Sequence, residues 1–253
     1  MKSHHRKTQN KIVSMKLIYM LLISFCLAGC KKENGLYNPY LDRMRKFQKE
    51  SEANPNDHTA LHKLEKYTTD SDYWNRYYAF SCLGELAKEN TGNCRQEVLP
   101  YFDKMLKDSD GGIRRMGAEK LLDMPSSVGE LLPTLLNIVK LGKEDDVTCF
   151  SAEALGKLED PKLISQAFPV LFEAAKKSPP EGTPDEAPQV RYYVLDSITE
   201  LAKKDNVNAV PQLEQLLSKS QSPYKVRVAK SILELDAANK AAKEILNSSD
   251  LKK

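Results

Sequence analysis

The sequence predicts an all-α protein built as an α-solenoid of about five helical hairpins. Three observations lead to this prediction. Apolar residues recur at helical spacing in short segments, polar turns join these segments in pairs, and close variants of the pair return along the chain. Neither helix of such a pair is long enough to hold its fold alone in water, so each pair needs neighbours on both sides.

The clearest pair covers Val98–Met124, where two amphipathic segments flank a turn rich in aspartate and glycine. Gly117 and Ala118 are small enough to let a neighbouring helix approach closely. Before this pair lie a first helix, which starts at Pro39, and two more helices that end near Tyr67 and Lys88. In chain order, the expected segments are 39–52, 57–67, 73–88, 98–108, 113–124, 130–142, 147–158, 163–177, 189–204, 207–219, 224–235 and a closing cap at 239–251.

The first 29 residues have the features of a cleaved signal peptide. A basic start is followed by the apolar run Leu17–Ala28, which is too short to span a bilayer. The run ends in Leu-Ala-Gly-Cys, which resembles the lipobox of bacterial lipoproteins, whose cysteine is lipidated and becomes the new N-terminus. Cys30 is therefore the expected lipid site, and residues 30–38 form a tether to the body at 39–253. Translation could also start at Met15, because the segment from Met15 to Cys30 is a complete lipoprotein signal by itself. The alternative to a signal peptide is a buried helix that happens to end in cysteine.

The charge balance changes once this segment is removed. Residues 1–29 hold five of the 38 basic residues and none of the 35 acidic ones, so the mature chain has a formal charge of −2. Bulk charge therefore gives no support to a role in binding nucleic acid. We expect a lipid-anchored protein that faces the periplasm or the cell exterior. Lys31 and Lys32 after the lipid site are compatible with outer-membrane sorting, and the sequence leaves the choice between inner and outer membrane open.

Two motifs recur in the helical pairs. The first helix carries a proline in four units, at Pro100, Pro133, Pro169 and Pro211, where it fits the first turn or kinks a longer helix. The second helix begins with an apolar residue and an arginine in three units, and Asn75-Arg76 is a weaker match. An aspartate stands six residues before the arginine in the pairs Asp70/Arg76, Asp108/Arg114 and Asp185/Arg191.

These motifs resemble those of HEAT and HEAT-like repeats, the latter including the bilin-lyase type, over roughly residues 56–236. The resemblance implies that the aspartate–arginine pairs form a structural ladder of hydrogen bonds between units. Gly142 and Thr148 stand at these positions in the third unit, so the ladder is expected to break there. The bilin-lyase relatives act in chromophore attachment, but no residue of this chain indicates that activity, and we expect no enzyme.

A solenoid of this kind offers a surface lined by its second helices, which generally binds protein segments. Aromatic residues that are common binding anchors gather on two of these helices, and inter-repeat packing is the alternative reading for them. The loop Ser178–Pro188, rich in proline and acid, is a second candidate surface or a tolerated insertion. The candidate protein-binding residues are Trp74, Tyr77, Tyr78, Tyr192 and Tyr193.

Other chemistry has little support. His58 and His62 lie one turn apart with Glu65 beyond them, but no third ligand is evident, so we expect no metal and no cofactor. Cys82, Cys94 and Cys149 are expected to be buried, with a Cys82–Cys94 disulfide as the alternative. We therefore expect a membrane-anchored scaffold for an unidentified protein partner, with no small-molecule substrate. The alternatives are an accessory or metal-dependent enzyme using His58 and His62, or a purely structural envelope protein.

Overall fold

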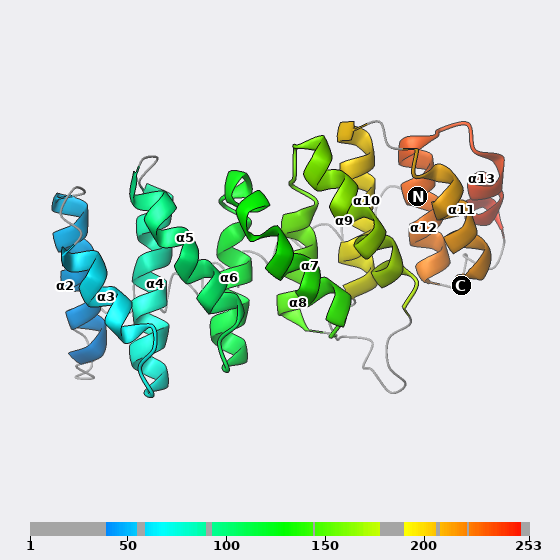
Figure 1. Ribbon diagram of the computed structural model, residues 1–253. Coiled ribbons are helices and arrows are strands. Elements are labelled where there is room, and N and C mark those ends of the chain that lie inside the picture. Colours follow the sequence, from blue (N-terminus) through cyan, green and yellow to red (C-terminus); the bar gives the residue numbers. More distant parts are fainter. Residues whose placement is uncertain are drawn as a thin grey trace, which may run out of the picture. The chain divides into compact units, whose positions relative to one another are not determined.

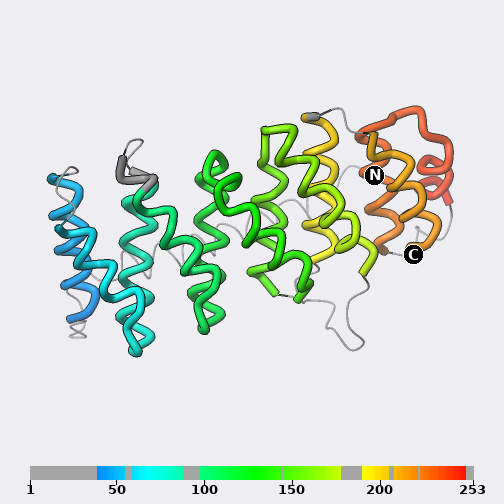
Figure 2. The backbone as a smooth tube through the Cα atoms, in the orientation of Figure 1, coloured from blue at the N-terminus to red at the C-terminus, as the bar shows by residue number. Residues whose placement is uncertain are grey.

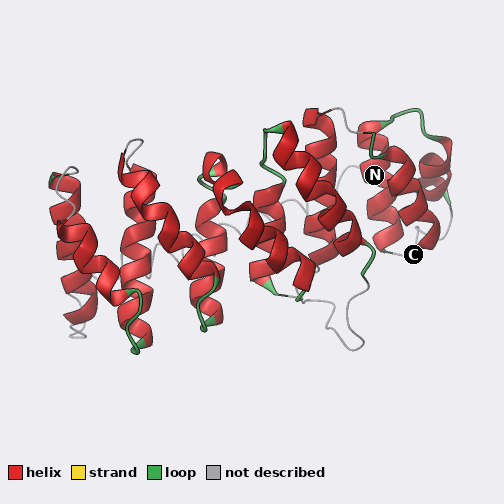
Figure 3. Ribbon diagram, viewed as in Figure 1, coloured by secondary structure: helices red, strands yellow, loops and turns green. Residues whose placement is uncertain are grey.

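The computed structural model describes residues 39–54, 59–89, 93–143, 145–177, 190–205, 208–221 and 223–248 of the chain. Within these ranges every regular element is helical and no strand occurs (Figure 3). The predicted signal peptide, the lipid site Cys30, the tether and the loop Ser178–Pro188 lie outside the described residues. No helix in the described part of the chain is long and apolar enough to cross a membrane.

Twelve α-helices and two short 3-10 turns make up the described part of the chain (Figure 1). Their number and order confirm the predicted all-α class, and most boundaries fall within a few residues of the expected segments. The helices are α2 (Pro39–Ala53), α3 (Thr59–Tyr67), α4 (Tyr73–Glu89), α5 (Asn93–Leu106), α6 (Gly111–Leu121), α7 (Leu132–Leu141), α8 (Asp146–Leu155), α9 (Pro161–Ala175), α10 (Val190–Asp205), α11 (Val210–Lys219), α12 (Tyr224–Leu235) and α13 (Lys240–Asn247).

The helices from α3 onward pack as five hairpins. Within each hairpin the first helix contacts the second, and the second helices contact one another in turn, as α4 with α6, α6 with α8, α8 with α10 and α10 with α12 (Figure 2). At one end α13 packs on α12. At the other, Phe47 of α2 stacks on Tyr67 of α3 with ring centroids 6.3 Å apart. The second helices thus form one continuous layer, as a solenoid requires.

The recurrent prolines occupy two different kinds of position. Pro133 and Pro211 lie in the first turn of α7 and α11, where the missing N–H has no helical partner to lose. Pro100 and Pro169 lie deeper, inside α5 and α9, because these helices start earlier than their apolar stripes suggest. The sequence allowed both arrangements, and the structure contains both.

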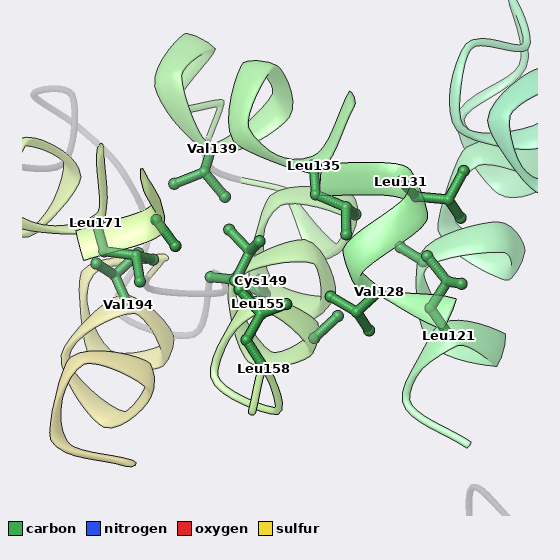
Figure 4. Packing of buried hydrophobic residues seen from close by; sticks show 14 of the residues in the cluster. Leu121, Val128, Leu131, Leu135, Val139, Cys149, Leu155, Leu158, Leu171 and Val194 are labelled. Carbon is green, nitrogen blue, oxygen red and sulfur yellow. The ribbon is translucent and has the colours of Figure 1, made fainter. Parts of the chain in front are cut away.

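One continuous hydrophobic core runs through the array, from Met44 of α2 to Ala242 of α13. Figure 4 shows its middle part, where side chains of α6, α7 and α8 meet. Gly117 lies where α5 and α6 approach closely, since a Cβ there would come within 2.8 Å of the Cβ of Met105. Close packing of this kind holds the two helices of the hairpin against each other.

Two of the predicted buried cysteines belong to this core. The side chains of Cys82 and Cys149 are buried, and Cys82 is a free thiol whose pKa burial raises to about 12. The described geometry therefore favours packing over the alternative of a Cys82–Cys94 disulfide. The side chain of Cys94 lies outside what the structure describes.

Candidate functional site

The first step of the ladder joins Arg76 of α4 to Asp108 in the turn of the next hairpin. Arg76 donates through Nε and Nη2 to the two carboxylate oxygens of Asp108, at 3.0 and 3.2 Å. Its Nη1 donates to the carbonyl of Asp70 in its own turn, at 2.9 Å. The side chains of Arg76 and Asp108 are only 13% and 7% exposed, and the hydrogen bonds raise the pKa of the arginine. This is a buried, two-pronged ion pair between repeats.

Helix caps define how the turns of successive repeats correspond. The carboxylate of Asp72 accepts from the N–H of Asn75 at 3.1 Å, and that of Asp110 accepts from the N–H of Ile113 at 3.3 Å. The ladder aspartate stands two residues before each cap, and the ladder arginine four residues after it. This N-cap chemistry starts α4 and α6 in the same register.

The cap of the third turn is Asp145, which accepts from the N–H of Thr148 at 2.9 Å. Counting from this cap, Lys143 takes the place of the ladder aspartate and the buried Cys149 takes the place of the arginine. The sequence assigned these places to Gly142 and Thr148, one residue earlier. Gly142 instead ends α7 in a left-handed conformation, with φ of 62°. A cation therefore stands where the second turn has Asp108.

The arginines of the last two repeats make different contacts. Arg191 lies with its guanidinium carbon 4.5 Å from the ring centroid of Tyr224, and its predicted partner Asp185 lies outside the described residues. Arg227 of α12 donates backwards to Asp196 of α10, from Nε at 3.1 Å and from Nη2 at 2.5 and 2.6 Å. The sequence analysis did not foresee this pair, in which both side chains are nearly half exposed.

Four aromatic rings form a cluster at the start of α4. The indole of Trp74 stacks on Tyr78 with ring centroids 5.7 Å apart and meets Tyr77 edge-on at 6.0 Å. Tyr73 contacts Trp74 at 4.9 Å and Tyr77 at 5.7 Å. Trp74 is 50% exposed, whereas the three tyrosines are half-buried against the core. The sequence analysis missed Tyr73, although its spacing from Tyr77 places both on one helical face.

The two predicted aromatics of α10 separate in space. Tyr192 is half-buried and meets Tyr224 edge-on, with ring centroids 5.4 Å apart. Tyr193 is 37% exposed, and burial together with neighbouring acids such as Asp146 and Glu153 raises the pKa of its hydroxyl. Of the five predicted aromatics, Trp74 and Tyr193 are thus the two most open to solvent.

The histidine pair gives no described metal site. His62 lies 3.2 Å from Glu65, from its Nδ1 to the carboxylate, and both are at the surface, while His58 lies outside the described residues. No group of three metal-ligating side chains gathers in the parts of the chain that the structure covers. The exposed contact between His62 and Glu65 is the arrangement expected of a helix surface.

Lysines near the ends of the second helices make a further set of links between repeats. Lys157, after α8, donates to the carbonyl of Leu122 after α6 at 2.6 Å. Lys204 of α10 donates to the carbonyls of Gly156 and Leu158 at 3.2 and 3.3 Å. These contacts satisfy carbonyls that a helix C-terminus leaves without partners. Their signal in the sequence is only the recurrence of lysine at the end of the second helix.

No protein-family model matches this sequence, and no curated protein matches it. Solved structures with a similar fold are known. The complex of CpcE and CpcF of phycocyanin lyase from Nostoc sp. PCC7120 aligns over 87% of this chain and 76% of its own, at 18% identity and a TM-score of 0.50. An engineered protein aligns over 76% and 86%, at 19% identity and a TM-score of 0.46. A designed armadillo repeat protein aligns over 78% and 98%, at 14% identity and 0.47.

The comparison with the lyase corrects one expectation. The expectation that this chain is not an enzyme, which rested on the lack of recognisable catalytic residues, is wrong, because the same helical-repeat fold occurs in a phycocyanin lyase. At 18% identity this likeness concerns the fold and carries over no activity. The chain has the HEAT- and armadillo-like fold of an α-solenoid.

Proposed function

We propose that this chain is a lipid-anchored protein of the bacterial envelope whose helical repeats bind a protein partner. The observation that carries the proposal is the ring cluster formed by Tyr73, Trp74, Tyr77 and Tyr78 at the start of α4. Repeat solenoids generally bind other proteins along a continuous surface, and the similar lyase structure is itself a complex of two chains.

The geometry of the cluster suits a binding anchor. The indole of Trp74 is half exposed, and it is held on one side by stacking against Tyr78 and on the other by contact with Tyr73. Because these neighbours already restrict the ring, little side-chain entropy would be lost when a partner covers it. A large, preorganised aromatic surface of this kind is typical of the residues that dominate binding energy at interfaces.

The lipid anchor rests on the sequence. The run Leu17–Ala28 followed by Gly29 and Cys30 supports diacylglyceryl modification of Cys30 after cleavage. Two acyl chains hold a protein to a bilayer far more firmly than one. The repeats would then face the periplasm or the cell exterior, at the end of the tether formed by residues 30–38.

The binding role is tested by crosslinking in cells followed by mass spectrometry, comparing the wild type with Trp74→Ala and Trp74→Phe. Circular dichroism first establishes that each variant is folded. We expect Trp74→Ala to lose a partner that Trp74→Phe retains, because phenylalanine keeps an aromatic surface at this place. If all three proteins crosslink to the same partners, the aromatic cluster serves packing and not binding. This result would favour a purely structural protein.

A matched variant locates the surface more closely. Tyr193→Ala removes the exposed aromatic of α10, which belongs to a different hairpin. Loss of the same partner in this variant would extend the binding surface along the layer of second helices. Retention of the partner would confine the surface to the start of α4.

The anchor is tested by growing cells with labelled palmitate and comparing the wild type with Cys30→Ser. We expect the wild type to carry the palmitate label and to be found in the membrane fraction. The Cys30→Ser variant should carry no label and should leave the membrane fraction. Equal labelling of both proteins would refute lipidation at Cys30. A variant with Met15 changed to Leu shows in addition whether translation starts there.

A further inference from the structure

The pair formed by Arg76 and Asp108 shows how an arginine of this chain binds a carboxylate, and it can be compared with the other arginines. Arg76 uses Nη1 on the carbonyls of Asp70 and Ser71, at 2.9 and 3.2 Å. This leaves the Nε–Nη2 edge of the guanidinium to receive both oxygens of Asp108. The flat edge of an arginine matches a carboxylate in geometry as well as in charge.

Arg114 repeats only half of this arrangement. Its Nη1 donates to the carbonyls of Asp108 and Ser109, at 2.8 and 2.9 Å, just as Arg76 does in its own turn. Through Nε and Nη2, however, it donates to no acceptor among the described residues. The next turn places Lys143 at the position of the missing aspartate, and the ammonium of Lys143 also contacts no described acid.

A cavity of about 390 Å³ lies at this place, between the second and third hairpins. Arg114 and Lys143 both line it, and neither of these cations forms an ion pair with a carboxylate of the described residues. A third cation, Lys107, is already engaged with Asp103 at 2.6 Å. Among the described residues of the lining the acid is Asp145, whose carboxylate accepts from the N–H and the hydroxyl of Thr148 at 2.9 and 2.7 Å.

The remaining walls of the cavity are mixed in character. Asn137 offers an amide, whereas Pro133 and Ile138 are apolar. The hydroxyl of Thr134 already donates to the carboxylate of Asp103 at 2.5 Å. Leu141, at the edge, is 64% exposed, the highest value among the large apolar side chains of the described chain. A cavity of this size, apolar with a few convergent charges, is typical of sites for small ligands or single side chains.

We propose that this cavity binds a carboxylate attached to an apolar group, with Arg114 and Lys143 holding the carboxylate and Leu141 and Ile138 covering the apolar part. The ligand would take the place that Asp108 takes beside Arg76. The site does not depend on the proposed role of the aromatic cluster. The carboxylate comes either from a protein C-terminus or from a small organic acid, and both share the chemistry that the cavity recognises.

Binding is tested on the purified full-length protein by isothermal titration calorimetry, which measures the affinity of every probe, including one without carbon-bound hydrogen. The probes are N-acetyl-leucine, its amide, 4-methylpentanoate and inorganic phosphate. We expect N-acetyl-leucine to bind and the uncharged amide to bind at least about tenfold more weakly, because a charge-assisted bidentate contact is lost. Phosphate lacks the apolar part and should also bind more weakly. Equal binding of the acid and the amide, or of the acid and phosphate, would overturn the proposal.

The two sources of the carboxylate differ in the peptide group. Tighter binding of N-acetyl-leucine than of 4-methylpentanoate supports a protein C-terminus, because only the former carries an amide next to the carboxylate. Equal binding of the two supports a small organic acid. In both cases Arg114→Gln should weaken binding about tenfold or more, and unchanged binding in this variant would refute the assigned role of Arg114.

In a second variant, the protein itself supplies the carboxylate that the ligand would otherwise provide. Lys143→Asp restores the ladder aspartate, which we expect to pair with Arg114 as Asp108 pairs with Arg76. The melting temperature should then rise by about 2–4 °C and N-acetyl-leucine should no longer bind. Lys143→Asn is the matched control, since it removes the lysine without supplying a carboxylate.

The double variant Arg114→Gln/Lys143→Asp isolates the new pair, because the gain in melting temperature should vanish once the arginine is absent. A Lys143→Asp protein that gains no stability over Lys143→Asn, or that still binds N-acetyl-leucine like the wild type, would overturn the proposal. The comparison of Lys143→Asp with Lys143→Asn does not use Arg114→Gln, so it remains decisive even where that variant fails to fold.

Discussion

The two steps that join the first three hairpins begin with the same arginine geometry and end differently. Between the first and second hairpins, Arg76 and Asp108 form a buried ion pair with both edges of the guanidinium occupied. Between the second and third, Arg114 and Lys143 both line a cavity. The second step nevertheless keeps its helix packing, since α6 contacts α8 closely. The array is therefore held by its apolar layer, and the polar ladder can be altered locally without loss of the fold.

The largest expected loss of stability comes from breaking the buried ion pair between Arg76 and Asp108. Asp108→Ala leaves the guanidinium of Arg76 buried without a counter-charge, which typically costs about 3–5 kcal/mol in the free energy of unfolding. Urea denaturation followed by circular dichroism measures this loss. Glu173→Gln is a suitable control, because its ion pair with Lys176 is largely exposed. A loss of about 1 kcal/mol or less, as for a surface pair, would contradict the contrast drawn above.

A smaller loss of stability is expected when Arg114, between the second and third hairpins, is changed. Arg114→Gln removes only the two hydrogen bonds to the carbonyls of Asp108 and Ser109, which corresponds to about 1–2 kcal/mol. The same denaturation experiment gives the value. If Arg114→Gln costs as much as Asp108→Ala, Arg114 has a stabilising partner comparable to that of Arg76, and the two steps are alike.

The smallest effect is expected for the backward pair between Arg227 and Asp196, whose side chains are 44% and 49% exposed. Arg227→Gln should change the free energy of unfolding by about 0–1 kcal/mol, because water competes for exposed charges. Repeating the measurement at high salt checks this cause, since salt should shrink the difference further. A large loss that is insensitive to salt would show that the pair acts as a buried ladder step.

The architecture could be predicted from the sequence because the apolar stripes recur and each stripe is long enough to show its period. The position of the helix cap in the turn of the third hairpin could not be predicted from the sequence. Its segment holds Glu144, Asp145 and Asp146 in succession, and the alignment that gave Gly142 and Thr148 corresponds to a cap one residue too early. Aspartate is a far better N-cap than glutamate, and the structure uses Asp145.

The partners of the ladder were also only half predictable. The spacing of six residues between Asp70 and Arg76 reflects a contact with the backbone carbonyl of Asp70, whereas the carboxylate comes from Asp108, 32 residues further along. Sequence spacing reports which residues share a turn, but the contact between repeats depends on how closely two hairpins stack. For the same reason the cavity beside Arg114 has no sequence signal of its own.

The contacts of Lys157 and Lys204 give the array a direction. Each of these lysines comes from a later repeat and covers the carbonyls at the end of the repeat before it. Removing a hairpin from either side exposes part of the apolar core. Removing α9 and α10 in addition uncovers the carbonyls at the end of α8 that Lys204 covers. A cut that removes α9 and α10 should accordingly leave the end of α8 more open to fraying and proteolysis, whereas a cut that removes only α11 and α12 should not, because Lys204 of α10 stays in place.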